Sequence, residues 1–258
     1  MEVKLMKIIA IMGSPHKGKG YQIVQKIEMA LKRWGDIDFQ YIFLKDVNLQ
    51  PCIGCFACIA KGESFCPLQD DRKSIETEML SADGIILSSP GYTQNVSGLM
   101  KNFMDRFAYS LHRPKFFNQS LMLVANGGSG LGKVIKALTM NLGGSRKICE
   151  LKITTTPWET TLKYRNQTDQ AIEKSAKKFY RAMIDKQKIR PDLGNLIWFK
   201  IFKKMASLSE QNLPADYQFY NDKPKFFYPV KVSLVKNGLA EVIAVLAVWS
   251  MKKQVDFK

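Results

Sequence analysis

The segment KIIAIMGSPHKGKG, residues 7–20, joins an apolar run to a loop rich in glycine and lysine. Beyond its first residue the run at 7–12 is entirely apolar, which is typical of a strand buried on both faces of a sheet. Residues 20–34 then carry apolar side chains at helical spacing: Ile23, Val24, Ile27, Ala30, Leu31 and Trp34. The segment therefore predicts a strand, a loop and a helix in succession.

The same alternation continues through more than half of the chain. The sequence predicts further strands at 39–44, 84–88, 121–125 and 148–153, and helices at 70–81, 97–111 and 131–142. Apolar strands that alternate with helices form a parallel sheet, with right-handed crossovers and helices on both faces. We therefore expect a doubly wound α/β domain built on a five-stranded parallel sheet.

The last third of the chain breaks this pattern. A helix predicted at 166–187 is followed by no further strand. Beyond it we expect a basic and aromatic helix, an irregular segment rich in Pro and Tyr, and a final apolar helix, at 193–207, 213–229 and 239–253. The predicted domains are therefore 1–187, with a cysteine-rich insertion at 50–68, and a C-terminal helical extension at 188–258.

Charge is distributed unevenly. The 258 residues carry a net charge of +16, all of it in residues 100–258, whereas residues 1–99 hold equal numbers of basic and acidic side chains. Residues 160–204 carry a local +8 along predicted helix. Such a stripe suits an anionic partner or is a solvated helix face. Because the charge belongs to the second half of the chain alone, we expect no nucleic acid as partner.

The apolar segments favour a cytoplasmic protein. Near the start, residues 8–12 are too short for a signal peptide, and 5 cysteines are too few for a disulfide scaffold of this length. The late apolar run at 242–251 has 10 residues, whereas a bilayer span needs roughly 20. We therefore expect no segment that crosses a membrane.

Three loops follow strands of the predicted sheet, at the edge where such sheets bind ligands. They lie at 13–20, 88–95 and 126–133 and are rich in Gly, Ser or Asn. The first and third resemble a nucleotide-binding P-loop, but Gly20 and Val134 stand where a magnesium-binding hydroxyl belongs. The first loop therefore suits a monophosphate without magnesium, bound by backbone N–H groups at a helix N-terminus, unless it is a plain tight turn.

A cysteine motif follows the second predicted strand. It reads Cys52-x2-Cys55-x2-Cys58-x7-Cys66-Pro67. Closely spaced thiols followed by proline are typical of [4Fe-4S] ligands, although the last gap is longer than in bacterial ferredoxins. A zinc site and free or redox-active thiols are the alternatives. A fifth cysteine, Cys149, lies in a predicted strand and is expected to be a small core residue.

Together, GSPHKGKG, the cysteine insertion and SSPGYTQNVSGLMKNFMDR resemble the NAD(P)H-dependent FMN reductase family, and within it the iron-sulfur flavoprotein branch. The resemblance covers about residues 7–187 and implies a flavodoxin-like fold. It implies that the first loop binds the FMN phosphate through Ser14, His16, Lys17, Gly20 and Tyr21. The family commonly has Asn-Thr in place of the Gly-Tyr pair that this chain carries there, which removes a hydroxyl.

The resemblance also implies which residues pass along the flavin ring: Pro90, Gly91, Tyr92, Thr93, Gln94 and Asn95 from one loop, and Asn126, Gly127 and Gly128 from the next. It implies Cys52, Cys55, Cys58 and Cys66 as cluster ligands. Asp105 and Arg106, also typical of the family, are expected to form a structural ion pair. No catalytic side chain is assigned because the flavin carries the chemistry. His112 is expected at a helix end.

These observations lead to one principal hypothesis and two alternatives. The principal one is a cytoplasmic FMN oxidoreductase that passes electrons from NAD(P)H or a reduced carrier, through flavin and with or without a cluster, to a quinone-like or protein acceptor. The first alternative is an electron carrier whose basic half docks an acidic, ferredoxin-like partner. The second is a cluster-free thiol redox sensor.

The final apolar helix leaves two options. It either packs onto the domain or a second subunit, or makes weak contact with an anionic membrane surface. We favour packing, because residues 242–249 are apolar on every side and therefore suit burial in protein. The family resemblance also implies a homo-oligomer.

Overall fold

The computed structural model describes residues 5–140, 142–185 and 190–257, which form two compact units. The first, here the sheet unit, comprises Met1–Cys52, Asp70–Phe107 and Lys115–Gln187. The second, here the helical unit, comprises Ile53–Gln69, Ala108–Pro114 and Lys188–Lys258. Two segments that precede the C-terminal extension therefore also belong to the helical unit.

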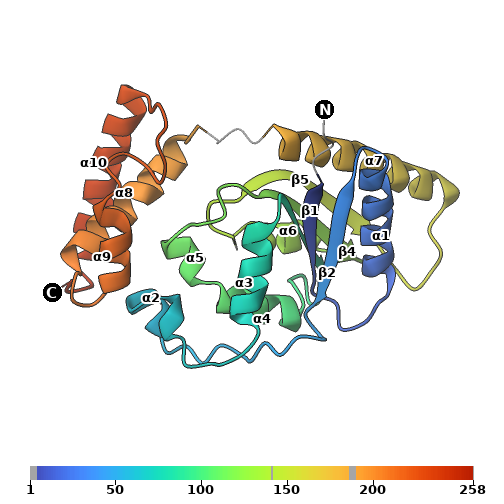
Figure 1. The fold of residues 1–258 in the computed structure, drawn as a ribbon, viewed down its shortest axis with the longest axis horizontal. Coiled ribbons are helices and arrows are strands. Elements are labelled where there is room, and N and C mark those ends of the chain that lie inside the picture. Colours follow the sequence, from blue (N-terminus) through green and yellow to red (C-terminus); the bar gives the residue numbers. More distant parts are fainter. Residues whose placement is uncertain (1–4, 141, 186–189, 258) are drawn as a thin grey trace. The chain divides into compact units, whose positions relative to one another are not determined.

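The sheet unit contains one five-stranded parallel sheet in the order β2-β1-β3-β4-β5 (Figure 1). The strands are β1 (Met6–Met12), β2 (Ile37–Phe43), β3 (Gly84–Pro90), β4 (Ser120–Gly127) and β5 (Arg146–Thr154). The central strand β3 is buried at every residue, as a parallel sheet covered on both faces requires. The doubly wound fold expected from the sequence is confirmed.

Helices cover both faces of this sheet (Figure 1). They are α1 (Lys19–Lys32), α3 (Arg72–Ser81), α4 (Gly98–Arg106), α6 (Leu131–Thr139) and α7 (Leu162–Ile184). On one face α1 and α7 pack over Ile8, Ile86 and Val124. Gly84 has no room for a side chain there, because a Cβ would lie 2.8 Å from the Phe179 ring. The expected helices 131–142 and 166–187 end earlier, and residues 141, 186 and 187 lie outside the described residues.

The helix expected at 97–111 is broken. In its place are α4 and a short helix, α5 (Tyr109–His112). The break falls where the chain passes from the sheet unit to the helical unit, and Phe107 and Tyr109 are fully buried on its two sides. On one straight helix these two side chains would point about 200° apart, so a turn between them helps to bury both rings.

A buried ion pair closes the base of the cysteine-rich insertion within the sheet unit. The side chains of Arg106 and Asp70 are 1% and 0% exposed, and Arg106 Nη2 lies 3.0 Å from Asp70 Oδ1. Arg106 also donates to the Gln50 carbonyl at 2.7 Å, and the Gln50 N–H donates to Asp70 at 2.9 Å. The two ends of the insertion, residues 50 and 70, are therefore held together.

The helical unit consists of α2 (Ala57–Ala60), a 3₁₀ turn η1 (Glu63–Phe65), α5, α8 (Leu193–Leu208), α9 (Pro214–Asn221) and α10 (Leu234–Met251). Its core is aromatic, with the Phe199 ring 5.7 Å from that of Tyr220 and 5.6 Å from that of Phe226. The segment 213–229, expected to be irregular, therefore contains a helix. It begins with proline, whose fixed φ suits a first helical turn.

A second arginine organises the insertion within the helical unit. Arg113 forms a buried ion pair with Asp216 of α9 and donates to the carbonyls of Cys58 and Ile59, where α2 ends. The other oxygen of Asp216 lies 2.8 Å from Nδ1 of His112. The insertion, α5 and the C-terminal extension therefore share one polar network, which explains why segments distant in sequence form a single unit.

The last helix differs from expectation in its length and its burial. It begins at Leu234, earlier than expected, and has 18 residues. By length and composition it is the one helix in the described ranges that is long and apolar enough to cross a membrane. Residues 242–249 are not enclosed by protein. One side of the helix, with Ala244 and Val248, is buried, while Leu246 and Trp249 are 59% and 58% exposed. The expectation that residues 242–249 are buried on every side is therefore wrong.

The Arg106–Asp70 pair gives a testable prediction. Burial raises the pKa of Asp70, but hydrogen bonds from Arg106 and from the backbone N–H groups of Arg72 and Gln50 lower it further than burial raises it. Its contribution to stability is therefore complete above the ordinary carboxyl pKa and is lost as pH falls through the lower folded pKa. We expect Asp70→Asn to cost about 3 kcal/mol at neutral pH, because Arg106 stays buried without a counter-charge.

Urea denaturation at several pH values measures this effect. Asp105→Asn is the control, because Asp105 pairs with Lys101 on the surface, where an ion pair contributes about 0.5 kcal/mol or less. Equal losses for the two variants would contradict the prediction, as would an unchanged acid dependence in Asp70→Asn.

Candidate functional site

The first loop leaves β1 at Gly13 and is tied to the neighbouring strand loop. The Gly13 N–H donates to the Ser88 carbonyl at 2.8 Å, and the Ser97 hydroxyl donates to the Gly13 carbonyl. A side chain at Gly13 would place its Cβ 2.8 Å from Cβ of Met100, so the close approach requires glycine. The Ser97 hydroxyl also accepts from the Met100 N–H and so caps α4, which means that one side chain connects the first loop to the start of α4.

The first helix begins without a side-chain cap. Its N-cap is Gly18, and its first backbone N–H groups have no partner within the helix. The preceding turn is shaped by Ser14, whose hydroxyl donates to the His16 carbonyl at 2.7 Å and accepts from the His16 N–H at 3.3 Å. Because uncapped N–H groups and the helix dipole attract anions, this end of α1 suits a phosphate.

The second loop carries strained backbone. Tyr92 and Asn95 exchange two backbone hydrogen bonds around Thr93 and Gln94, which have φ of 49° and 58°. Two successive positive φ values define a type I′ turn, which usually contains Gly or Asn, so this Thr-Gln pair is strained. Strain of this kind is concentrated at functional sites. The loop is braced by Gly91, whose N–H donates to the Asn126 carbonyl at 2.7 Å.

Asn126 joins the first and third loops. Its Nδ2 lies 3.3 Å from Oγ1 of Thr155, but its Oδ1 is buried and has no hydrogen-bond partner. A Cβ added to Gly20 would lie 2.7 Å from that oxygen. The glycine therefore opens the start of α1 to Asn126 and leaves an acceptor for a ligand donor, which is a recognised reason for an unsatisfied buried polar atom.

The predicted binding residues of the three loops meet at the carboxyl edge of β1, β3 and β4. The side chains of two of them are turned elsewhere. Lys17 places its Nζ 4.4 Å from the centroid of the Phe43 ring, and the Tyr21 ring packs against Tyr41 and Phe43. Tyr21 is therefore limited to its backbone.

The four motif cysteines are divided between the two units. Cys52 belongs to the sheet unit and is held by its N–H, which donates to Oδ1 of Asn102 at 3.2 Å, whereas Cys55, Cys58 and Cys66 belong to the helical unit. Within the described ranges, no three His, Cys, Asp or Glu side chains are grouped so that they could hold a metal ion. We therefore derive no step of the reaction through a cluster.

Three other expectations concern single side chains. Asp105 and Arg106 do not pair with each other, because successive helical residues point about 100° apart; they pair with Lys101 and Asp70. His112 lies at the end of α5, as expected. Cys149 packs against the sheet core, and burial raises the pKa of its thiol to about 12, so it stays protonated at neutral pH.

Sequence comparison identifies the class of protein that this fold and loop arrangement define. The chain belongs to the NADPH-dependent FMN reductase family, whose sequence pattern matches residues 6–149.

Named relatives refine this result. The chain is 44% identical over 102 residues to an iron-sulfur flavoprotein of Methanocaldococcus jannaschii, a match that covers 39% of this chain and 51% of the relative. It is 29% identical over 213 residues to an iron-sulfur flavoprotein of Clostridioides difficile, covering 78% and 91%. In the match to the Methanocaldococcus jannaschii relative, as in one to an iron-sulfur flavoprotein of Archaeoglobus fulgidus, the chain spans about half the length of the relative.

Solved structures share the fold. An NAD(P)H:quinone oxidoreductase from Methanothermobacter marburgensis superposes with a TM-score of 0.54 at 12% identity, covering 67% of this chain and 98% of that one. An FMN-dependent NADH-azoreductase from Bacillus anthracis in complex with FMN gives 0.51 at 13% identity, covering 67% and 99%. At such identities the likeness concerns the fold alone, which is the flavodoxin-like fold expected from the sequence.

Sequence reasoning missed the residues that shape the site without lining a Gly-rich loop. Ser97 and Thr155 hold loop residues through hydrogen bonds. A signal existed for Ser97, which stands as an N-cap just before the apolar spacing of α4. For Thr155 there was none, because its role depends on β5 lying beside β4.

The Gly20–Asn126 contact gives the next prediction. We expect Gly20→Ala to lower the free energy of unfolding by about 1–3 kcal/mol, because the new Cβ overlaps Oδ1 of Asn126, and to weaken FMN binding. Gly132→Ala on α6 is the control, since a Cβ there meets nothing within 4 Å. Thermal unfolding and flavin titration measure both effects. Unchanged stability and unchanged flavin affinity in Gly20→Ala would contradict the assignment.

Proposed function

We propose that the protein is an NAD(P)H-dependent FMN oxidoreductase that delivers electrons to a quinone-like or protein acceptor. The observation that carries this proposal is the cradle between Gly20 and Asn126, where an uncapped helix start and an unsatisfied buried oxygen lie together. A planar cofactor with a phosphate at one end and N–H donors on its ring suits both features. FMN is such a group, and it fits the residues present.

The chain itself supplies placement. The start of α1 would hold the phosphate through backbone N–H groups, where the uncapped helix end adds partial positive charge. The turn at Thr93–Gln94 and the glycines that follow β4 would lie along the ring, where backbone N–H groups reach its heteroatoms. Bound FMN supplies the hydride and electron transfer, so no protein acid or base is required.

The acceptor is proposed by analogy with relatives. Structures of the same fold include a protein named as an NAD(P)H:quinone oxidoreductase. Curated relatives are named iron-sulfur flavoproteins, which supports a second redox centre at the four motif cysteines. A cluster at that motif, NADH or NADPH as donor, a homo-oligomeric state and a cytoplasmic location are all part of this proposal.

A flavin assay tests the proposed cofactor. We expect about one FMN per chain after reconstitution, identified by chromatography of the released flavin. Ser14→Ala should weaken FMN binding by about 1 kcal/mol or more, because it removes the hydroxyl that shapes the phosphate turn. Ser81→Ala is matched as a control, since its hydroxyl also donates to a nearby carbonyl, on α3.

The same preparation tests turnover. Steady-state oxidation of NAD(P)H with quinone acceptors is the expected result, whereas flavin reduction without turnover would favour an electron carrier. Recovery of FAD, or of no flavin after reconstitution, would overturn the cofactor assignment.

Iron and sulfide analysis after anaerobic purification tests the cluster. We expect about four iron and four sulfide per chain, and Cys55→Ala should lose the iron while it keeps the flavin. Cys149→Ala is the control, because that thiol lies on β5, outside the motif. Stoichiometric zinc, or no metal after reconstitution, would reject the cluster and favour the zinc or thiol alternatives.

A further inference from the structure

The last helix of the helical unit exposes a continuous apolar surface. At 100° per residue, the solvent-facing side of α10 carries only apolar side chains and Gly238 over nearly half its circumference. We call this surface the apolar arc; its large members are Leu234, Val235, Leu239, Val242, Val245, Leu246 and Trp249. Soluble proteins rarely expose a contiguous apolar surface of this kind without a partner for it.

The opposite side of α10 is already occupied. Ala240, Ala244 and Val248 are buried against α8, where Phe199 and Ile201 complete the contact. The core of the helical unit therefore does not use the arc. At about 1.5 Å per residue, α10 extends about 27 Å, so the arc is a long stripe on a helix that is firmly seated.

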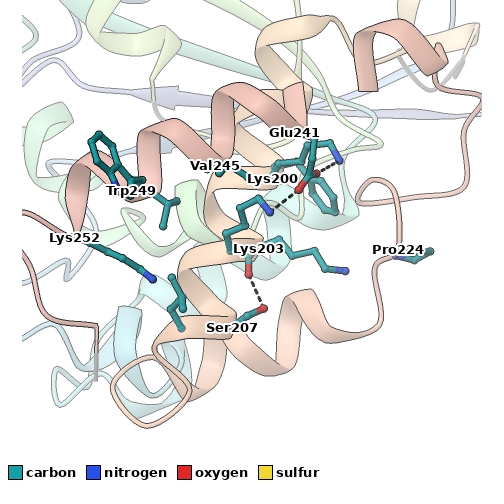
Figure 2. Close-up of a pocket in the computed structure, with 12 residues that line it drawn as sticks. Lys200, Lys203, Ser207, Pro224, Glu241, Val245, Trp249 and Lys252 are labelled. Carbon is teal, nitrogen blue, oxygen red and sulfur yellow. Dashed lines mark hydrogen bonds and ion pairs between the residues drawn. The ribbon is translucent and has the colours of Figure 1, made fainter. Parts of the chain in front are cut away.

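A lysine-rich groove of about 580 Å³ runs along one edge of the arc (Figure 2). Val245 and Trp249 of α10 line it together with Lys200 and Lys203 of α8 and Lys252. The one carboxylate of the groove, Glu241, accepts hydrogen bonds from Lys200 at 2.7 Å and from Lys204. Four lysines therefore face one carboxylate, so the groove has an excess of positive charge.

Positive charge also continues beyond the helix end. Lys253 places its Nζ 4.2 Å from the centroid of the Trp249 ring. Residues 188–258 carry 12 basic and 6 acidic side chains, a net charge of +6. The arc is thus bordered by cations along one side and at its C-terminal end, the pattern of an amphipathic helix that lies at the interface of an anionic membrane.

We propose that α10 docks the protein onto the surface of an anionic lipid membrane, with the apolar arc in the acyl boundary and the lysines of the groove at the headgroup phosphates. Charge decides between this partner and a second copy of the chain. A symmetric pair joined through the arc would bring two lysine grooves to one interface, where like charges repel. Lipid phosphates neutralise the same lysines.

Docking in the plane of the membrane also suits the helix better than crossing it. Glu241 lies in the second turn of α10 and pairs with Lys200 and Lys204 of the helix packed alongside. A spanning position would carry these charges into hydrocarbon, which is costly. In the plane of the interface they stay at the level of the headgroups.

Vesicle flotation with the full chain tests this proposal. We expect binding to vesicles of phosphatidylglycerol mixed with an excess of phosphatidylcholine, weaker binding to phosphatidylcholine alone, and a decline as salt is raised. Leu246→Glu should weaken binding roughly tenfold or more, because it places a charge in the arc. Leu162→Glu is the matched control, a similarly exposed leucine on α7 of the sheet unit, and should bind as the unchanged chain does.

The lysines are tested separately. Replacing Lys252 and Lys253 with Gln should weaken binding roughly fivefold for each lysine, whereas Gln at Lys163 and Lys174 of α7 should leave it unchanged. Circular dichroism confirms that the variants fold, and Val242→Thr serves as a milder arc variant if Leu246→Glu does not fold. Tryptophan emission should shift to the blue on vesicle addition, and Trp249→Phe should abolish that shift while flotation persists.

Three results would overturn the proposal. The first is the absence of the full chain from floated anionic vesicles at low salt, and the second is flotation that Leu246→Glu leaves unchanged. The third is a dimer by light scattering that Leu246→Glu converts to a monomer, in a chain that binds no vesicles, because the arc would then be covered by a second copy.

Discussion

The buried ion pair between Arg106 and Asp70 is the constraint on which the layout of the chain depends. It clamps residues 50 and 70, so a long insertion leaves the sheet unit and returns to it at a single point. The sheet can then keep an unbroken β2-β1-β3 order although the insertion separates β2 from β3 in sequence. A few residues later, Arg113 holds the insertion from inside the helical unit through the Cys58 and Ile59 carbonyls. Two arginines on one stretch of chain thus hold the insertion that carries the motif cysteines: Arg106 at its base and Arg113 at α2.

The parallel sheet could be predicted because its signal is local. Each strand is an apolar run, and each run is separated from the next by a helical pattern, so the order of elements alone implies a doubly wound fold. The break after α4 could not be predicted in this way, since apolar residues such as Phe107 and Tyr109 continue across it and both are fully buried. The exposure of α10 could not be predicted for the same reason, because an apolar residue gives the same sequence pattern whether or not a neighbour covers it.

The candidate site divides along similar lines. Glycine-rich loops at strand ends mark the phosphate cradle, and resemblance to a family extends this to the flavin ring. The features that give the cradle its chemistry are contacts across the sheet, such as Asn126 beside Gly20 and the Ser97 hydroxyl on Gly13. These contacts depend on which strands are neighbours in the sheet, and the residue types alone do not predict the order of the strands. The cysteine motif shows the converse, since a clear spacing in sequence corresponds to thiols that the fold divides between two units.

The discontinuous helical unit has a consequence for biosynthesis. Arg113 and Asp216, which form its buried ion pair, are 103 residues apart, so at about 5–20 residues per second the arginine emerges about 5–20 seconds before its partner. During that interval β4 and β5 emerge and complete the five-stranded sheet, while the segment with Cys55, Cys58 and Cys66 has no aromatic core to join. The nascent chain therefore passes through a stage in which these thiols are exposed, and any chemistry that loads or oxidises them has a defined window before Asp216 emerges to pair with Arg113.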